Sequence, residues 1–448
     1  MFVDLLIIAI IKEIIMNRFF KLTENGTTIK TEIAAGFTTF LTMSYIIIVN
    51  PAILTAAGIP ANQVFMATII SAVIASTWMG LVANYPIAIA PGLGLNAYFV
   101  SVVATGVDYK TAFSSVFIAG VIFLLLSLTT FREKLILAIP ESLKSAISAG
   151  IGLFIAFVGL RLSSVIVADP VNLVKLGDLH SPGVLLALFG LILTVVLLLL
   201  NVPGAIFVGM IIIALLAVIT GQIKFDGFMS LPSFGDQLMI TNPLKPFKDI
   251  VDHSLYGAVL SFLLITIFDT TGTMIGVAKR AGLMKDGNLP RAKQALFADA
   301  LGTTVGAVFG TSPTTAYIES GTGVAVGGRT GLTTITVAVL FFLSSFFYPV
   351  VSVLASAPAV TAPALIIVGS MMIGEAANIN WEDLSEGFPA FLVIITMPLT
   401  SSIATGLALG FMTYPITKFI KGQSKEVHPL IYVFAVLFFI QLFLLGGH

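Results

Sequence analysis

Long apolar stretches, separated by short breaks that are polar or rich in Gly and Pro, fill almost the whole chain. A helix of about 20 apolar residues crosses the hydrocarbon core of a bilayer with its backbone groups bonded internally. The composition fits that solvent, because 57% of the residues are hydrophobic and 10% are charged, against about 25% charged in soluble domains. We therefore predict an all-α integral membrane protein with 14 transmembrane spans. The expected spans are residues 33–56, 64–83, 87–104, 112–129, 143–160, 183–200 and 204–221, followed by 254–276, 293–309, 312–328, 331–348, 361–375, 387–400 and 402–420.

The spans form two series of seven, and the second series repeats landmarks of the first. Pro86 and Pro313 lie 227 positions apart (313 − 86), and the same offset places Gly94 on Gly321. An odd number of spans per copy inserts the second copy upside down, as in the inverted repeats of many secondary transporters. We therefore expect a 7+7 inverted repeat. A further apolar stretch at 430–445 lies outside it, as a fifteenth span or a helix along the membrane interface.

Two polar, Gly- and Pro-rich stretches, residues 83–96 and 309–323, interrupt the third and tenth spans. A break at membrane depth leaves backbone N–H and C=O groups that lipid cannot satisfy, so it persists only where it lines a protein-enclosed cavity. We expect short strands and half-helices in these two broken spans. The breaks also predict the position of the binding site.

Charge and residue usage exclude several functional classes. The net charge is zero and the basic residues are scattered along the chain, so the sequence shows no basic patch that would bind nucleic acid. The chain has no cysteine, and its four histidines have no ligand spacing, so we expect no metal site and no cofactor. Because no phosphate-binding Walker motif is present, an ion gradient rather than ATP is the expected energy source.

The distribution of Lys and Arg predicts the orientation. With the N-terminus in the cytoplasm, 16 of the 22 basic residues fall on the cytoplasmic side, as the positive-inside rule requires. Residues 1–32 form a cytoplasmic leader in this scheme. Its apolar part, 5–11, is too short to span a bilayer, and Met16 is an alternative start to Met1.

Asp269 and Glu319 are the principal candidates for chemistry, because an ionisable side chain within a span costs roughly 2.5–3.5 kcal/mol. Asp269 lies deep in the eighth span, and Glu319 opens the half-helix after the Pro313 break. The structural alternatives are that Asp269 only bonds neighbouring Thr hydroxyls, and that Glu319 only caps the Gly321 and Thr322 amides. Asn96, beside the other break, offers both donors and acceptors to a ligand with mixed edges.

Other acids favour structural roles. Asp299 is expected to close a helix–helix hydrogen bond. Glu375, Glu382, Asp383 and Glu386 are expected in a solvated acidic turn.

Four motifs carry a resemblance to a known family. They are the runs at 37–46 and 84–99, the Phe-Asp-Thr-Thr-Gly-Thr segment at 268–273, and Ile-Glu-Ser-Gly-Thr-Gly at 318–323. Together they closely resemble the AzgA-like adenine/guanine/hypoxanthine permeases of the nucleobase:cation symporter and nucleobase–ascorbate transporter superfamily. The resemblance runs from about Met16 to the C-terminus.

This resemblance implies two domains with different roles in transport. A core domain would carry the substrate and consists of residues 33–129 and 254–348. A gate domain would dimerise and remain stationary, and consists of residues 143–221 and 361–420. Residues 421–448 would form a C-terminal tail with the extra apolar helix. The resemblance further implies proton-coupled, elevator-like import of purine nucleobases in the plasma (inner) membrane by a homodimer.

The resemblance also implies the binding residues. Asp269 and Glu319 occupy the positions that bind the two edges of the base, and either is a candidate for the coupled proton, because removing water from a carboxyl favours its protonated form. Asn96, Gly94, Thr273 and Ser320 are further substrate-binding candidates. Related transporters stack an aromatic on the base where this chain has Pro91. The stacking candidates here are Phe40, Tyr98, Phe99 and Phe268.

Two alternatives remain open at this point. A sulfate-type anion transporter shares the inverted-repeat fold, but its site should present Arg or bare amides rather than two acids. A membrane enzyme or receptor would need a nucleophile–base set or a sizeable ligand-binding domain, whereas the longest loops have only about 30 residues.

Overall fold

The computed structural model describes residues 16–129, 138–225, 227–235, 237–242, 245–253, 255–284 and 289–444, and helices dominate them. Among these described residues, nine helical segments are long and apolar enough to cross a membrane. They are Ile29–Ala57, Ala61–Ala83, Tyr109–Ser127, Glu141–Leu162, Pro182–Leu199, Tyr256–Arg280, Gly331–Ala355, Pro358–Asn378 and Ile403–Ile420. The prediction of a helical membrane protein is confirmed at this level.

Each of the fourteen expected segments contains a helix or half-helix at its expected place. The boundaries shift by a few residues in most cases. The helix of the first expected segment begins at Ile29 rather than at residue 33, and the eleventh segment continues to Ala355 rather than ending at 348. The stretch after 430 forms one more apolar helix.

One group of helices packs mainly within itself and contains both interrupted segments. Its members are α2 (Ile29–Met43), α3 (Ile46–Leu54), α4 (Ala61–Trp78), α5 (Leu93–Ala104), α6 (Tyr109–Ser127), α12 (Tyr256–Arg280), α13 (Ala292–Phe309), α14 (Ser320–Val326), α15 (Gly331–Ser344) and α16 (Tyr348–Ala355). Short α11 (Pro246–Asp252) packs on α6. We call this the first helix group.

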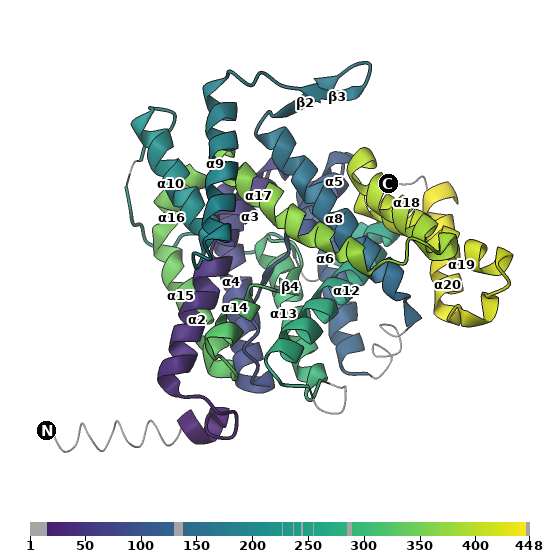
Figure 1. Cartoon of the computed structure of the whole chain (residues 1–448), viewed down its shortest axis with the longest axis horizontal. Helices are drawn as coiled ribbons and strands as arrows, with labels where there is room; N and C mark the ends of the chain where they lie inside the picture. Colours follow the sequence, from purple (N-terminus) through teal and green to yellow (C-terminus); the bar gives the residue numbers. More distant parts are fainter. Residues whose placement is uncertain are drawn as a thin grey trace, which may run out of the picture.

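The remaining helices pack against one another as a second helix group. Its members are α8 (Glu141–Leu162), α9 (Pro182–Leu199), α10 (Ala205–Ile219), α17 (Pro358–Met372), α18 (Leu384–Thr400), α19 (Ile403–Ile420) and α20 (Pro429–Phe439). A hairpin of β2 (Ile166–Asp169) and β3 (Leu173–Leu176) follows α8 and projects from one end of the molecule (Figure 1).

The two halves of the sequence interleave in space rather than forming separate lobes. Purple α2 from the first half lies beside green α14 and α15 from the second (Figure 1). In the same way α8 packs on α17 and α18. The two groups meet where α5 faces α8, α12 faces α19 and α2 faces α10.

A buried carboxylate joins the two halves in the first helix group. Glu32 of α2 is fully buried and accepts hydrogen bonds from the backbone N–H groups of Arg329 (2.8 Å) and Thr333 (3.1 Å) and from the Thr333 hydroxyl (2.6 Å). An acid at a helix start satisfies amides that have no partner within the helix. Glu32 therefore fixes the beginning of α15 against α2.

The leader predicted for 1–32 is described only from Met16 onward, so its apolar part at 5–11 lies outside the described residues. Phe20 and Leu22 are buried against Leu332 of α15, and the Asn84 amide donates to the Phe20 carbonyl over 3.0 Å. The described part of the leader is therefore packed onto the first helix group.

Candidate functional site

The two interrupted segments meet in a small buried sheet. Strand β1 (Ile89–Pro91) pairs antiparallel with β4 (Thr314–Ala316), with Ala90 opposite Thr315. Pairing satisfies the backbone groups that the breaks leave without a helical partner. The bonds continue past the strands, from Gly92 N–H to the Pro313 carbonyl and from Tyr317 N–H to the Ala88 carbonyl, both at 3.0 Å.

A half-helix follows each strand, after one residue for β1 and after three residues for β4. Leu93 opens α5 and Ser320 opens α14. The starts of helices carry unpaired N–H donors and a partial positive charge. Because β1 and β4 run antiparallel, α5 begins beyond the end of the sheet where Pro91 pairs with Thr314, and α14 begins beyond the end where Ile89 pairs with Ala316.

Asp269 lies within α12 beside this sheet. Its neighbours Phe268 and Thr270 are buried, whereas Asp269 itself is only half-buried. The Thr315 hydroxyl on β4 is hydrogen-bonded to its carboxyl. Its hydroxyl partner thus comes from the broken segment rather than from its own helix.

Glu319 immediately precedes α14 and is also half-buried. Its side chain makes no capping bond to the half-helix, so the structure does not support a capping role for it. Instead, Glu319 Oε1 accepts a hydrogen bond of 2.6 Å from the Tyr45 hydroxyl.

Both acids lie next to β4, since Asp269 bonds the Thr315 hydroxyl of this strand and Glu319 follows its last residue by three positions. Tyr317, between β4 and Glu319, donates its hydroxyl to the Pro91 carbonyl over 2.5 Å.

Every fourth or third residue beyond Asp269 lies on the same face of α12. On that face Gly272 and Gly276 are exposed, with open space where a side chain would be, and Thr273 is half-buried. An accessible face therefore runs from Asp269 along α12 to Arg280 at the end of the helix.

The other predicted binding residues have protein partners. Asn96 is fully buried beside Ser312, which bonds its Oδ1, and its Nδ2 has no hydrogen-bond partner among the described residues. Ser320 uses its hydroxyl to accept the Ala88 N–H at 3.0 Å. A Cβ at Gly94 would lie 2.3 Å from Ile151 Cγ2, so close packing on α8 explains that glycine.

Three of the four stacking candidates have ring partners inside the protein. Phe99 stacks on Phe113 with ring centroids 4.3 Å apart. Tyr98 contacts Phe262 at 4.7 Å, and Phe40 contacts Phe341 at 5.4 Å. Phe268 is buried next to Asp269 in the chain.

Asp299 on α13 has the helix-linking role expected for it. It is fully buried and accepts the hydroxyls of Thr270 on α12 (2.5 Å) and Thr314 on β4 (2.7 Å). The Thr270 hydroxyl also lies 3.1 Å from that of Thr315. Asp299 therefore fixes α12 against the sheet beside Asp269.

The expectation that Glu386 belongs to a solvated turn is wrong. Glu386 lies in the first turn of α18 and pairs with the buried Lys418 of α19 at 2.6 Å. Ser142 and Tyr414 also donate to its carboxyl, Tyr414 over 2.9 Å. These groups border a cavity of about 450 Å³, but they already bond one another.

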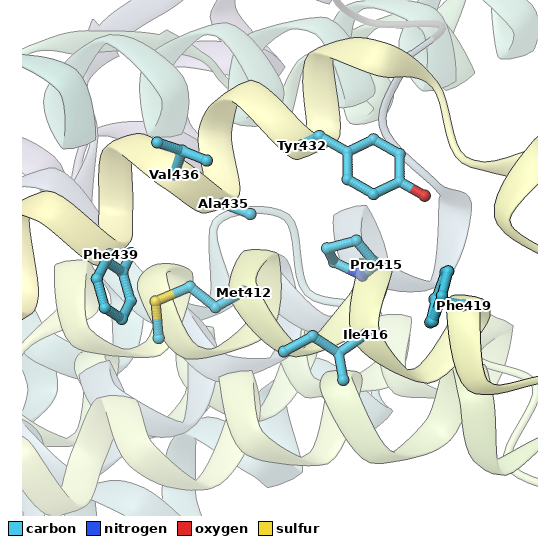
Figure 2. A pocket seen from close by; sticks show the side chains of 8 residues that line it. All are labelled: Met412, Pro415, Ile416, Phe419, Tyr432, Ala435, Val436 and Phe439. Atoms are coloured by element: carbon cyan, nitrogen blue, oxygen red, sulfur yellow. The ribbon is translucent and has the colours of Figure 1, made fainter.

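An apolar groove of about 430 Å³ lies between α19 and α20, away from both acids. Figure 2 shows its lining side chains, of which Tyr432 carries the only oxygen. That hydroxyl lies 3.4 Å from the Ser424 carbonyl. A polar ring would find no oriented partner in this groove.

Sequence reasoning missed Tyr45, Thr315 and Tyr317. The sequence contained one indication for Tyr45. The repeat offset of 227 places Tyr45 on residue 272 (45 + 227), which is three residues after Asp269. No cluster of His, Cys, Asp and Glu that could hold a metal occurs in the part of the chain that the structure describes.

The apolar helices, the two broken segments and the acids between them define an integral membrane protein of the transporter class. The permease family Xan_ur_permease matches residues 30–409, and the chain belongs to this family. The resemblance noted in the sequence is thereby confirmed.

Similar proteins cover nearly the whole chain. The guanine/hypoxanthine permease PbuO of Bacillus subtilis is 61% identical, over 95% of this chain and 100% of that protein. PbuG of the same organism, also a guanine/hypoxanthine permease, is 49% identical over 94% and 98%. The adenine permease AdeP of Escherichia coli is 41% identical over 97% of each chain.

Solved structures share the fold at low identity. The transmembrane domain of the cyanobacterial bicarbonate transporter BicA has a TM-score of 0.62 at 16% identity, covering 84% of this chain and 97% of that one. SLC26A9 has a TM-score of 0.65 at 12% identity, covering 88% and 66%. The anion-transporter alternative thus shares the architecture, whereas the sequence relatives are nucleobase permeases.

Proposed function

We propose that this protein imports purine nucleobases by ion-coupled secondary active transport, with guanine and hypoxanthine ahead of adenine. The observation that carries the proposal is that both acids lie beside β4 of the broken segment, Asp269 bonded to the Thr315 hydroxyl and Glu319 between β4 and α14. The substrate order follows the relatives, because the two guanine/hypoxanthine permeases are 61% and 49% identical and the adenine permease 41%.

The chemistry of a purine ring suits this arrangement. A carboxylate only accepts hydrogen bonds, and the ring presents N–H donors on more than one edge. Asp269 would bind one edge and Glu319 the other, with Thr273 close to Asp269 on the same face of α12. Asn96 Nδ2, which has no partner among the described residues, would reach the ligand only after a shift of its side chain.

The coupling ion in this proposal is the proton. A carboxyl that loses its water on ligand binding favours the protonated form, so Asp269 or Glu319 would load a proton together with the base. The accessible face of α12 ends at Lys279 and Arg280, which the positive-inside rule assigns to the cytoplasm. Substrate and proton would leave by that route.

The transport cycle would move the first helix group, as core domain, past the second, as gate domain. The 14 spans would form a 7+7 inverted repeat, with the N-terminus in the cytoplasm and the gate domains joining a homodimer in the inner membrane. The packing of helices into two groups that meet at α5–α8, α12–α19 and α2–α10 supports this division.

Uptake into proteoliposomes tests the proposal. We expect accumulation of radiolabelled hypoxanthine and guanine when the lumen is more alkaline than the medium, and its loss when a protonophore collapses the gradient. Adenine should compete more weakly, and uracil and sulfate should not be taken up.

Two outcomes would contradict it. Uptake of sulfate without purine uptake would favour the anion-transporter alternative. Purine uptake that follows a sodium gradient at constant pH would support the proposed substrate but contradict the proton as the coupling ion.

A further inference from the structure

Tyr45 is a buried phenol in the first span with a partner far away in the sequence. Its side chain is 1% exposed, and its hydroxyl donates to Glu319 Oε1 over 2.6 Å, across 274 positions of the chain. A buried hydroxyl normally finds a partner. Here the partner is one of the two acids of the proposed nucleobase site.

The local backbone brings Tyr45 to this place. Helix α2 ends at Met43 and α3 begins at Ile46, so Tyr45 lies in the break between them. Ser44 and Tyr45 keep right-handed helical backbone angles, and the Val49 N–H donates to the Tyr45 carbonyl over 2.9 Å. Tyr45 therefore lies at the junction of the two helical parts of the first span.

Close packing fixes the distance between the two helices that carry this pair. The hydroxyls of Thr42 on α2 and Thr322 on α14 lie 3.0 Å apart. A Cβ at Gly323 of α14 would lie 2.1 Å from Thr39 Oγ1, so only glycine permits this approach. The Tyr45 hydroxyl therefore meets the Glu319 carboxyl because both backbones are held in place.

We propose that Tyr45 is a positioning residue of the nucleobase site, whose hydroxyl holds Oε1 of Glu319 so that Oε2 faces the ligand in one orientation. The inference rests on the proposed function. A hydrogen bond to a carboxylate is shorter and stronger than one between neutral groups. A carboxyl that is already ordered loses less entropy when the base binds, which strengthens binding.

The test is hypoxanthine uptake by the full-length protein in proteoliposomes. Tyr45→Phe removes only the hydroxyl, and we expect the KM to rise about tenfold, as for the loss of a hydrogen bond to a charged group, with the maximal rate changed less than about twofold. A merely structural role would lower the amount of active protein and leave the KM unchanged.

A double-variant comparison shows whether Tyr45 acts through Glu319. Glu319→Ala removes the acceptor of the Tyr45 hydroxyl and should raise the KM, and adding Tyr45→Phe should raise it no further, because effects of coupled residues do not add. Additive losses would overturn the inference. A wild-type KM in Tyr45→Phe, with Glu319→Ala impaired, would also overturn it.

A matched control is available elsewhere in the chain. Tyr414 donates to Glu386 over 2.9 Å in the second helix group, and Tyr414→Phe should leave the KM unchanged. Should Tyr45→Phe not be recovered as monodisperse protein, Tyr45→Leu removes the donor with different packing, and a wild-type KM there overturns the inference. Failure of the wild-type protein to transport any purine would instead contradict the proposed function.

Discussion

At the scale of the residue, this protein keeps two carboxyls half-buried and gives each a hydroxyl partner from another element. The Thr315 hydroxyl is hydrogen-bonded to Asp269, and the Tyr45 hydroxyl donates to Glu319. The partners occupy part of each carboxyl and leave acceptor capacity free. In the proposed function, this free acceptor capacity would bind the donors of the purine ring.

Asp269→Asn tests the first of these acids. The amide keeps the size of the side chain but adds a donor and cannot take up the proton, so we expect purine uptake to fall to background while the protein remains folded. Uptake at fixed protein amount and size-exclusion profiles would be measured together. Normal transport by this variant would remove Asp269 from the site.

Asp299→Ala tests the buried link beside the site. The buried hydroxyls of Thr270 and Thr314 would lose the carboxylate as an acceptor and keep only their neutral partners, Thr315 Oγ1 and the carbonyl of residue 299. A hydrogen bond to a charged group contributes about 1.5–3 kcal/mol. We expect a clearly lower melting temperature in detergent. Asp299→Asn keeps one acceptor oxygen and should lower the melting temperature less than Asp299→Ala does. Equally lowered melting temperatures in the two variants would contradict the role of the Asp299 carboxylate.

At the scale of the element, glycines decide how closely the broken and unbroken helices approach. A Cβ at Gly331, the first residue of α15, would lie 1.9 Å from the carbonyl oxygen of Gly80. Asn84 adds to this contact by accepting the Gly331 N–H at 2.7 Å. The crossing therefore depends on a backbone without side chains.

Gly331→Ala should destabilise the protein by about 3 kcal/mol, because the methyl group meets rigid backbone rather than a movable side chain. Thermal unfolding in detergent measures the effect. Gly183→Ala at the start of α9 is the control, since nothing lies within 4 Å of its added Cβ. Equal stability of the two variants would contradict the proposed crossing.

The start of α18 offers a prediction about pH. Asp383 caps this helix, and Lys421 at 2.7 Å, with the Ser385 hydroxyl and N–H, holds the pKa of its carboxyl well below its usual range. A lowered folded-state pKa stabilises the protein above the unfolded pKa of about 4, and the benefit is lost as the pH falls toward the folded pKa.

Asp383→Asn should therefore lower the melting temperature at pH 7 by more than it does at pH 3. The two melting curves are compared with those of Glu382→Gln, which changes the exposed neighbouring acid. A difference between Asp383→Asn and wild type that stays constant from pH 7 to pH 3 would contradict the assignment.

At the scale of the whole molecule, the natural absence of cysteine makes relative movement of the two helix groups directly testable. An ideal Cβ at Gly94 of α5 lies 3.6 Å from Ile151 Cβ of α8, within the range of disulfides. Gly94→Cys with Ile151→Cys would thus join the two groups.

We expect oxidation of this pair to stop transport and reduction to restore it to the level of the same variant before oxidation. The matched control joins two helices of the second group, where an ideal Cβ at Gly209 of α10 lies 3.2 Å from Thr194 Cβ of α9. Oxidation of the Thr194→Cys, Gly209→Cys pair should leave uptake unchanged. Undiminished uptake by the cross-linked Gly94–Ile151 pair would contradict an elevator-like movement.

The sequence by itself determined the solvent, the places of the helices and the two breaks. Apolar length and the positions of Gly and Pro act locally, so α5 (Leu93–Ala104) and α14 (Ser320–Val326) lie within the expected segments 87–104 and 312–328. Asp269 and Glu319 stood out because a charged group within an apolar span is costly whatever its surroundings.

Only the tertiary structure decided which side chains meet. Tyr45 reaches Glu319 across 274 positions, and Asp299 joins Thr270 to Thr314, because the two halves interleave and bring distant segments into contact. The tertiary structure also places Glu386 in an ion pair with Lys418 rather than in the expected solvated turn. Hydrogen bonds depend on distances of about 3 Å, which local sequence patterns do not encode and the packing of both halves together does.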